Sequence, residues 1–216
     1  MEDVRESEKL SRKEKEHLFR RKEILEAALK LFATKGYDGA SMQEIAAASE
    51  FSIGTLYNFF STKEELYLTL IEEKILESRE WVEQRVKLEK DPLRKIYAAI
   101  EATLTFMENN REFFLLFLFI QAMPNSVVHK GIHERILNSY EKHVDFFREL
   151  MEECEKEKLL RDFKPEELAM SLIGITHAWI YRWLSGPGDK DWLQQHERIM
   201  DLFLNGARVA AGKPKK

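Results

Sequence analysis

Helix-start signals recur at short intervals in the first third of the chain. Ser41 and Glu44 have the three-residue spacing of a capping box, in which the hydroxyl accepts from the third amide and the carboxylate reaches back. Ser52 can cap the next helix, and Thr62 with Glu65 repeats the capping-box spacing. A helix that starts after Ser41 has room for only about two turns before the next start. The sequence therefore predicts short helices here, followed by a longer one.

Longer helices are predicted on both sides of this segment. Apolar residues at three- and four-residue spacing predict a first helix over residues 18–35, which Gly36 ends as a C-cap. A long helix is expected from Lys63 towards Glu89, because Pro92 breaks the pattern. Further helices are expected over residues 92–109, 111–123, 132–158, 165–185 and 190–210. We therefore expect an all-α fold of about nine helices.

A change in helix length near residue 60 marks the expected domain boundary. With 216 residues, the chain suits one large or two small domains. We expect a three-helix domain over residues 1–61, with residues 1–17 as a flexible arm or a helix extension. A larger helical domain is expected over residues 62–216.

The charge of the chain is weakly acidic overall but locally basic. A net charge of −4 argues against a protein that coats nucleic acid through bulk basicity. Residues 9–22 nevertheless contain seven basic and two acidic side chains, a net charge of +5. This arm is either a solvated charged segment or a local binding surface for anions.

Several classes of protein are disfavoured. Cys154 is the only cysteine, which rules out an internal disulfide framework. The apolar run over residues 113–120 is far shorter than the ~20 residues that span a bilayer, so we expect a cytoplasmic protein without membrane contact. No nucleophile elbow, phosphate loop or dinucleotide fingerprint is present, and His129 with His133 is a weak metal pattern; we expect no enzyme, no cofactor and no metal.

The segment FSIGTLYNFF, residues 51–60, has the properties of a DNA-reading helix. In a helix-turn-helix, two short helices joined by a tight turn place the second in a major groove about 12 Å wide. Gly54 would let the backbone approach a phosphate, while Leu56 and Phe60 would anchor the opposite side in the core.

The run ILEAALKLFATKGYDGASMQEIAAASEFSIGTLYNFFSTKEEL, residues 24–66, resembles the DNA-binding domain of the TetR family of transcriptional regulators. The resemblance covers about a fifth of the chain, and the remainder is similar to the family only in architecture. It implies a homodimer that places two recognition helices in successive major grooves of a pseudo-palindromic operator on double-stranded DNA. Repression is the expected mode of action.

Individual DNA contacts follow from the same resemblance. Thr55 and Tyr57 correspond to the main recognition-helix contacts, Gln43 to a base reader on the preceding helix, and Lys63 to a phosphate clamp. Secondary contacts are expected from Ser41, Ser52, Gly54 and Asn58. The chemistry agrees, because glutamine pairs bidentately with adenine and threonine can touch a thymine methyl group. The alternatives are that the serines only cap helices, that Tyr57 packs sideways, and that Lys63 is solvated.

Three positions depart from the family pattern. Glu50 stands where the turn often has glycine, so the turn needs a different or costlier backbone. Ile53 replaces a residue that is frequently polar, and Phe59 replaces a frequent phosphate donor. We expect the basic arm to compensate for part of the missing electrostatic attraction.

The C-terminal half is expected to bind an effector and to dimerise through its last two helices, as the resemblance implies. Apolar stripes that suit a four-helix interface comprise Leu168, Leu172, Ile175, Trp179, Ile199 and Phe203. The alternative is that these stripes face only their own core.

Aromatic side chains dominate the expected effector site. Its candidate residues are Phe113, Phe117, Gln121, Tyr140, Phe147, His177 and Trp179. Such a lining favours a small, mainly apolar or aromatic effector with few polar anchors. His177 is the main polar anchor, unless it is a satisfied core histidine. The alternative function is a helical small-molecule carrier or adaptor that does not bind DNA.

Overall fold

The computed structural model describes residues 11–122, 127–186 and 192–207; the side chains of residues 117–122, 127–137, 193 and 207 lie outside the description. Within these ranges the chain forms nine α-helices and one short 3-10 helix, and no strand. The expectation of an all-α fold is thus confirmed. Among the described helices, none combines the length and the apolar character needed to cross a lipid bilayer.

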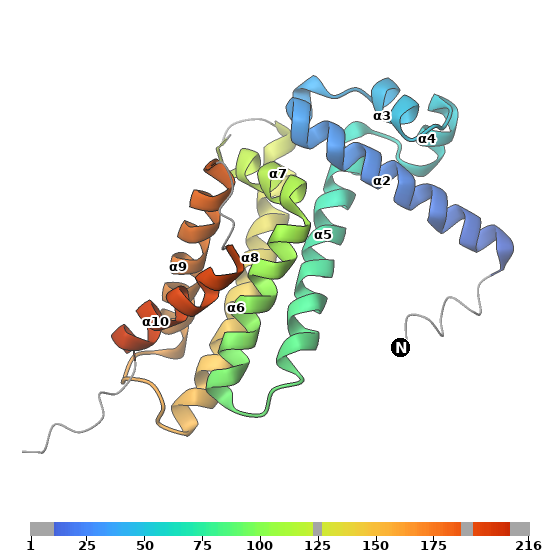
Figure 1. The fold of residues 1–216 in the computed structure, drawn as a ribbon. Coiled ribbons are helices and arrows are strands. Elements are labelled where there is room, and N and C mark those ends of the chain that lie inside the picture. Colours follow the sequence, from blue (N-terminus) through green and yellow to red (C-terminus); the bar gives the residue numbers. More distant parts are fainter. Residues whose placement is uncertain (1–10, 123–126, 187–191, 208–216) are drawn as a thin grey trace, which may run out of the picture.

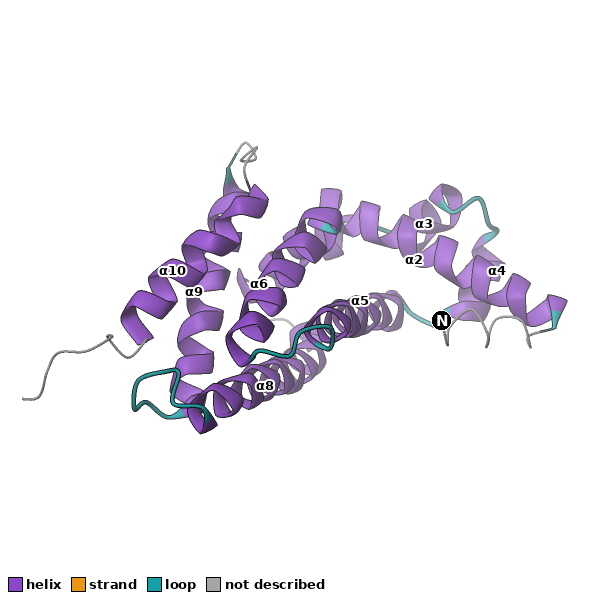
Figure 2. Cartoon of the chain, turned by 60° about the horizontal axis from the view of Figure 1, so that its bottom comes forward, coloured by secondary structure: helices purple, strands orange, loops and turns teal. Residues whose placement is uncertain are grey.

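Figure 1 shows two parts of the molecule joined by α5. The helices are α2 (Arg12–Gly39), α3 (Met42–Ala48), α4 (Ile53–Phe59), α5 (Lys63–Val86), α6 (Pro92–Asn109), α7 (Arg111–Ala122), α8 (Val127–Lys156), α9 (Pro165–Ser185), η1 (Trp192–Gln194) and α10 (Gln195–Ala207). Helices α2, α3 and α4 form the smaller part, and α6 to α10 pack around the other end of α5. In Figure 2 the long helices α5 and α8 are seen foreshortened, beside α6 and α9.

The helix starts follow the predicted caps with one change. The Ser41 hydroxyl accepts from the Glu44 amide at 3.2 Å and Glu44 accepts from the Ser41 amide at 3.0 Å, which confirms the capping box. Thr62 accepts from the Glu65 amide at 3.0 Å, but the Glu65 carboxylate accepts from Ser61 instead of Thr62. The second box is therefore only half formed.

Helix α2 begins earlier than the periodicity of residues 18–35 indicates. Ser11 and Glu14 form a capping box that starts the helix at Arg12. Charged residues occupy most of this added stretch, so apolar periodicity does not detect it. The helix breaks at Gly36, as expected, with φ 71° and ψ 173°, a conformation that is essentially restricted to glycine.

Helix α8 also begins before its predicted start at residue 132, whereas α6 and α9 have the expected bounds. Helix α8 packs mainly against α9, and α5 against α6. Helix α10 lies against α9 and α6, and α7 contacts α2. The contacts that α2 makes with α5 and α7 therefore connect the smaller part to the larger one.

The two apolar stripes predicted to form a dimer interface mostly face the protein's own core. Leu168, Leu172, Ile199 and Phe203 are at most 6% exposed, so a second copy cannot reach them without unfolding the helices around them. Ile175 and Trp179 are half-buried. Apolar periodicity shows that a helix has a buried face, but it does not show whether the partner belongs to the same chain. The outward faces of these helices carry Met170, Gly174 and Leu202.

Candidate nucleic-acid interface and inner cavity

The turn between α3 and α4 contains a non-glycine residue in a left-handed conformation. Glu50 has φ 60°, which confirms that this turn uses a costly backbone. The turn is closed by backbone hydrogen bonds from Glu50 to Ala47 at 3.2 Å and from Phe51 to Ala46 at 3.0 Å. Ser49 is buried here and donates to Ile45 at 2.8 Å. These bonds set the angle between the two helices without a glycine.

Helix α4 has a buried side and an exposed side. Leu56 and Phe60 are buried, at 0% and 2% exposure, and they anchor the helix as predicted. Ser52 accepts from the Thr55 amide at 3.1 Å, and the two hydroxyls share a hydrogen bond of 2.9 Å. Tyr57 is 47% exposed, so it does not pack sideways into the core. Ile53, Gly54 and Asn58 are exposed on the same helix.

Phe59, one of the departures from the family pattern, packs against the extension of α2. Its ring lies 4.5 Å from the imidazole ring of His17, measured between centroids. Arg20 and Arg21 lie over the rings of Phe51 and Phe60, at 5.9 and 5.6 Å. His17, Arg20 and Arg21 of α2 therefore contact rings in and beside α4, whereas residues 12–16 are exposed on the surface.

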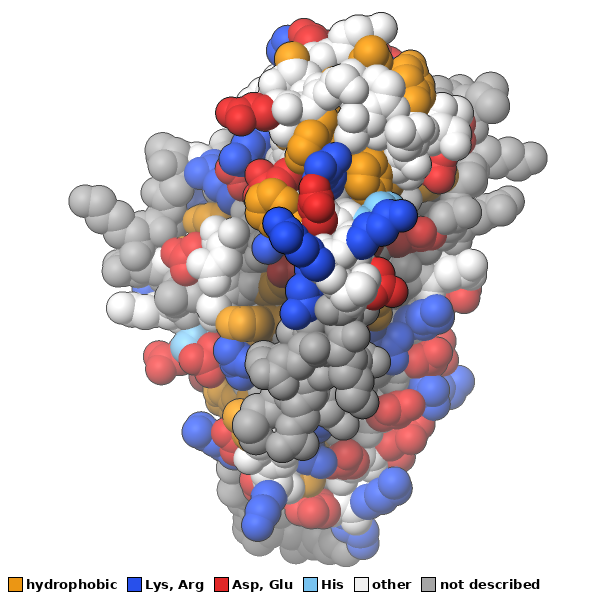
Figure 3. Space-filling view, turned by 90° about the vertical axis from the view of Figure 1, so that its right-hand side faces the viewer, with side chains coloured by type: hydrophobic (Ala, Val, Ile, Leu, Met, Phe, Trp, Pro, Cys, Tyr) orange, Lys and Arg blue, Asp and Glu red, His pale blue; other side chains and the backbone are white. Residues whose placement is uncertain are grey.

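The basic side chains of residues 12–22 divide into those with and those without an ion pair. Arg20 pairs with Glu16, Arg21 pairs with Glu73, and Lys22 lies 3.7 Å from Glu26. Among the described residues, Arg12, Lys13 and Lys15 are exposed and make no ion pair; Lys9 lies outside the description. Figure 3 shows charged side chains gathered around the end of α2, below a mainly uncharged surface formed by α3 and α4. Cations available to a phosphate backbone therefore lie on α2 more than on α4.

Lys63 holds the end of α2 in place. Its ammonium group donates to the carbonyls of Tyr37 and Ala40 at 2.9 and 3.1 Å and lies 4.3 Å from the Tyr37 ring centroid. Lys63 is thus not simply solvated. Two of its three N–H groups are used within the protein, which leaves one for a phosphate.

Ser41 and Gln43 differ in what they can offer to DNA. Ser41 is half-buried and its hydroxyl is used in the capping box, whereas the Gln43 side chain is exposed. Glu44 also binds Lys35 at 2.5 Å; hydrogen bonds from Lys35 and then Ser41 lower the pKa of this carboxyl to about 2. Ser41 therefore supports the start of α3, while Gln43 faces solvent.

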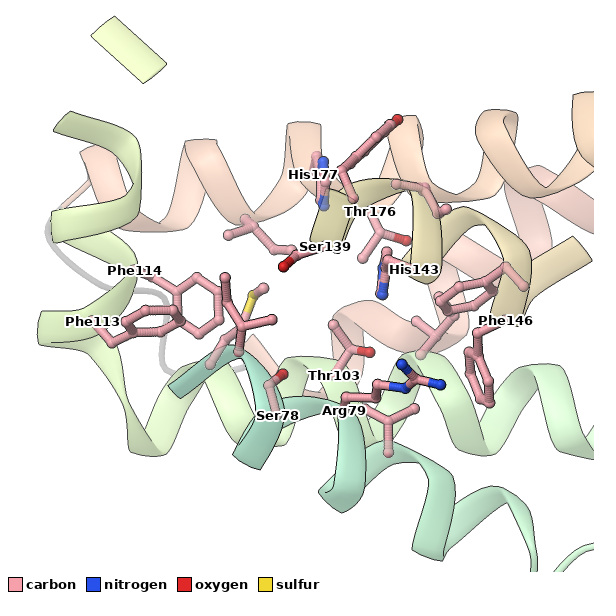
Figure 4. Close-up of a pocket in the computed structure, with 18 of the residues that line it drawn as sticks. Ser78, Arg79, Thr103, Phe113, Phe114, Ser139, His143, Phe146, Thr176 and His177 are labelled. Carbon is pink, nitrogen blue, oxygen red and sulfur yellow. The ribbon is translucent and has the colours of Figure 1, made fainter. Parts of the chain in front are cut away.

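The larger part of the molecule contains a cavity of about 380 Å³. Its walls come from α5, α6, α7, α8 and α9, and most of the lining is apolar. Figure 4 shows polar side chains from facing helices converging in the middle, beside the phenyl rings of α7. The polar lining residues are Ser78, Arg79, Thr103, Ser139, Tyr140, Lys142, His143, Thr176, His177 and Tyr181.

A pair of histidines lies in this cavity. The rings of His143 and His177 are nearly parallel, 7° apart, with centroids separated by 6.4 Å. Burial lowers the pKa of His143 to about 4, with a further contribution from His177, and burial also lowers the pKa of His177. Both imidazoles are therefore neutral at pH 7. The tyrosine ring of Tyr140 lies 6.4 Å from that of His177.

The cavity contains four of the residues predicted for it. Phe113, Tyr140, Phe147 and His177 line it, whereas Trp179 does not. The side chains of Phe117 and Gln121, like those of His129 and His133, lie outside the described residues. His143 was not predicted, although its four-residue spacing from Phe147 places both on one face of α8.

Both parts of the chain match known protein families. Residues 24–70 match the family described as bacterial regulatory proteins, tetR family. Residues 89–207 match the domain described as tetracyclin repressor-like, C-terminal domain. The first match ends within α5 and the second begins after it, and α5 passes from one part of the molecule to the other.

Individual relatives align with this chain over different lengths. The transcriptional activator FasR of Mycolicibacterium smegmatis is 34% identical over 93 residues, 43% of this chain and 42% of FasR. The uncharacterised regulator YhgD of Bacillus subtilis is 25% identical over 169 residues, 76% of this chain and 84% of YhgD. The chain thus spans less than half of FasR, and it covers only 19% of the regulator YuxN of Bacillus subtilis.

Solved structures have the same fold. The fatty acid degradation regulator FadR from Bacillus halodurans superimposes with a TM-score of 0.77 at 18% identity, over 87% of this chain and 95% of FadR. AibR, solved in complex with isovaleryl coenzyme A and operator DNA, gives 0.68 at 25% identity, over 85% of this chain and 97% of AibR.

Proposed function

Because the chain belongs to the tetR family of bacterial regulatory proteins, we propose that this transcriptional regulator binds a pseudo-palindromic operator as a homodimer and represses transcription until a small effector releases it. The observation that carries this proposal is the division of α4 into a buried side and an exposed side. A helix that is anchored by Leu56 and Phe60, and that exposes Gly54, Tyr57 and Asn58, suits insertion into a major groove.

Specific roles follow from the exposure of each side chain. We propose that Tyr57 and Thr55 contact the operator from α4, and that Gln43 reads a base from α3. Ser52 contributes mainly as the cap of α4, since its oxygen is bound to Thr55. Lys63 uses its remaining N–H group on a phosphate while it holds the end of α2. Arg12, Lys13 and Lys15, at the start of α2, supply further phosphate contacts.

The proposed dimer interface uses the outward faces of α9 and α10. Met170 and Leu202 are 51% and 58% exposed, which leaves apolar surface for a second copy. Gly174 lies on the same side of α9 as Met170, and its lack of a Cβ atom permits close approach. A four-helix interface between two copies would cover these residues.

The cavity is the proposed effector site, and α5 connects it to the DNA-binding end. Ile75, Arg79 and Val82 of α5 line the cavity. At its other end, α5 buries Leu66 and Leu70 in the core that also contains α2 and α4. An effector that favours a shifted position of α5 would change the separation of the two recognition helices from the ~34 Å between successive grooves. AibR was solved with isovaleryl coenzyme A and operator DNA together, which supports a fold that accepts both kinds of partner.

A gel-shift titration tests the DNA-binding half of this proposal. The duplex is selected from a random-sequence library by the wild-type protein, and it is then titrated with the Thr55→Ala, Tyr57→Ala double variant. We expect the affinity to fall at least about tenfold, because each base contact contributes roughly 1–3 kcal/mol. Phe163→Ala is the matched control, since Phe163 is another half-exposed aromatic residue that lies between α8 and α9.

Equal affinity of the wild type and the double variant would contradict the assignment of α4. Failure of the wild type to select any duplex, with no salt-sensitive binding, would instead favour the carrier or adaptor function.

A further inference from the structure

The cavity lining has basic but no acidic side chains among the described residues. The basic residues are Arg79, Lys142, His143 and His177. A ligand with a fixed positive charge would therefore find no carboxylate to neutralise it. A ligand with a carboxylate would meet groups that are positive or that can become positive.

The neutral polar groups differ in their capacity to donate hydrogen bonds. The Thr103 and Thr176 hydroxyls donate to carbonyls of their own helices, Ala99 and Leu172, each at 2.8 Å. They can offer a ligand only acceptor lone pairs. Each neutral imidazole has one N–H donor and one acceptor nitrogen, and the rings of His143 and His177 face each other across 6.4 Å. The hydroxyls of Ser78, Ser139, Tyr140 and Tyr181 can also donate to a ligand, but the two imidazoles are the neutral lining groups that can take up a proton near neutral pH.

We infer that the effector is a monocarboxylic acid with an apolar tail, and that its binding brings one proton into the cavity, shared by its carboxyl group and the His143–His177 pair. This inference rests on the proposed effector role of the cavity. The apolar tail would lie against the α7 side, where Phe113 and Phe114 form the wall.

The number of protons follows from the two bound states that are available. Before binding at pH 7, the acid is a carboxylate in water and both imidazoles are neutral. In the complex, the group is either a carboxylic acid bonded to a neutral imidazole or a carboxylate paired with an imidazolium. Both complexes contain one proton more than the separate molecules, and the proton comes from the buffer. A bare carboxylate beside two neutral imidazoles would lack a compensating charge there.

The other charged groups around the cavity do not replace this proton. On α5, Arg79 is ion-paired with Glu83 at 2.7 Å and is about half exposed at the cavity wall. On α8 the titratable neighbours are Tyr140 and Lys142, and Lys142 is exposed. On α9 the neighbour is Tyr181, while α6 and the described side chains of α7 contribute no titratable lining group. The half-buried histidine pair is therefore the lining site at which an added proton can neutralise a carboxylate.

Calorimetric titration of the full chain tests the inference with decanoate and 1-decanol as probes. Titrations at pH 7 in two buffers of different ionisation enthalpy give the number of protons taken up. We expect about one proton for decanoate and none for 1-decanol. We also expect the affinity for decanoate to rise by about tenfold for each unit that the pH falls between 8 and 6.5.

The variants His143→Gln and His177→Gln locate the proton. Each should reduce proton uptake by decanoate, because glutamine keeps a polar group in the cavity but cannot take up a proton. If a variant does not fold, the comparison of the two probes on the wild-type protein still decides the matter.

Binding of decanoate without proton uptake, binding of 1-decanol only, or binding of neither probe would overturn the inference. A gel shift with the selected duplex separates this failure from that of the proposed function. Operator binding that does not respond to decanoate would contradict only the inference about the effector. Absence of any operator binding would contradict the proposed function itself.

Discussion

Gly54 allows the fold and the function of α4 to be tested separately. The residue is exposed in the first turn of a seven-residue helix. A Cβ atom built at this position meets only the Ser52 hydroxyl oxygen, at 3.9 Å, which is an ordinary contact. The free protein therefore has room for alanine, whereas a DNA backbone in close contact with α4 would not leave that room.

The size of both effects can be estimated. Alanine in place of glycine within a helix stabilises by about 0.5–1 kcal/mol, which corresponds to a rise in Tm of roughly 1–4 °C for a chain of this size. Removal of a hydrogen bond between a backbone amide and a phosphate costs about 1.5–3 kcal/mol. We therefore expect Gly54→Ala to raise the melting temperature while it weakens operator binding by at least about tenfold.

Thermal unfolding and gel-shift titration measure the two effects on the same preparation. Gly206→Ala is the matched control, because Gly206 is an exposed helical glycine of α10 with no atom within 4 Å of the added Cβ. It should be at least as stable as the wild type, and Phe163→Ala serves as the control for operator binding, because Gly206 lies one turn from Leu202 on the proposed dimer face. A Gly54→Ala variant with wild-type affinity would refute the close approach of α4 to DNA, and a lower melting temperature would refute the packing argument.

Three further predictions concern charge and backbone strain. Replacement of Arg12, Lys13 and Lys15 by glutamine should flatten the slope of log affinity against log salt, by about 0.9 for each phosphate that these cations neutralise in the wild type; an unchanged slope in gel-shift titrations would exclude the extension from the interface. Glu50→Gly should stabilise the protein by about 0.5–1 kcal/mol in urea unfolding, since it relieves a φ of 60°, whereas Glu50→Ala keeps the strain and should give no gain. The pKa of His143 is lower in the folded protein than its ordinary 6.5, so the unfolded chain binds the proton first. Stability should therefore be complete above pH 6.5 and fall by up to about 3 kcal/mol as the pH drops towards 4, a loss that His143→Gln should remove from urea unfolding curves.

Local signals predicted most of the DNA-binding end. The capping box at Ser41, the break at Gly36 and the strained turn at Glu50 all depend on residues within four positions of each other. The half-formed box at Thr62 and the early start of α2 show the limit of such signals. A charged helical turn has no apolar periodicity, and a neighbouring amide such as that of Ser61 can compete for the same carboxylate.

The sequence by itself determined most helix ends, apart from the early starts of α2 and α8, as well as which side of α4 is buried and that the chain resembles DNA-binding regulators. Only the tertiary structure decided how distant residues meet. His143 and His177 lie on different helices, and no local spacing indicates that their rings are nearly parallel across a cavity. Likewise, Leu172 and Met170 are both apolar residues of α9, yet one is buried and the other exposed. The physical reason is that caps and turns are made by neighbours in the chain, whereas burial depends on which other helices compete for each apolar face.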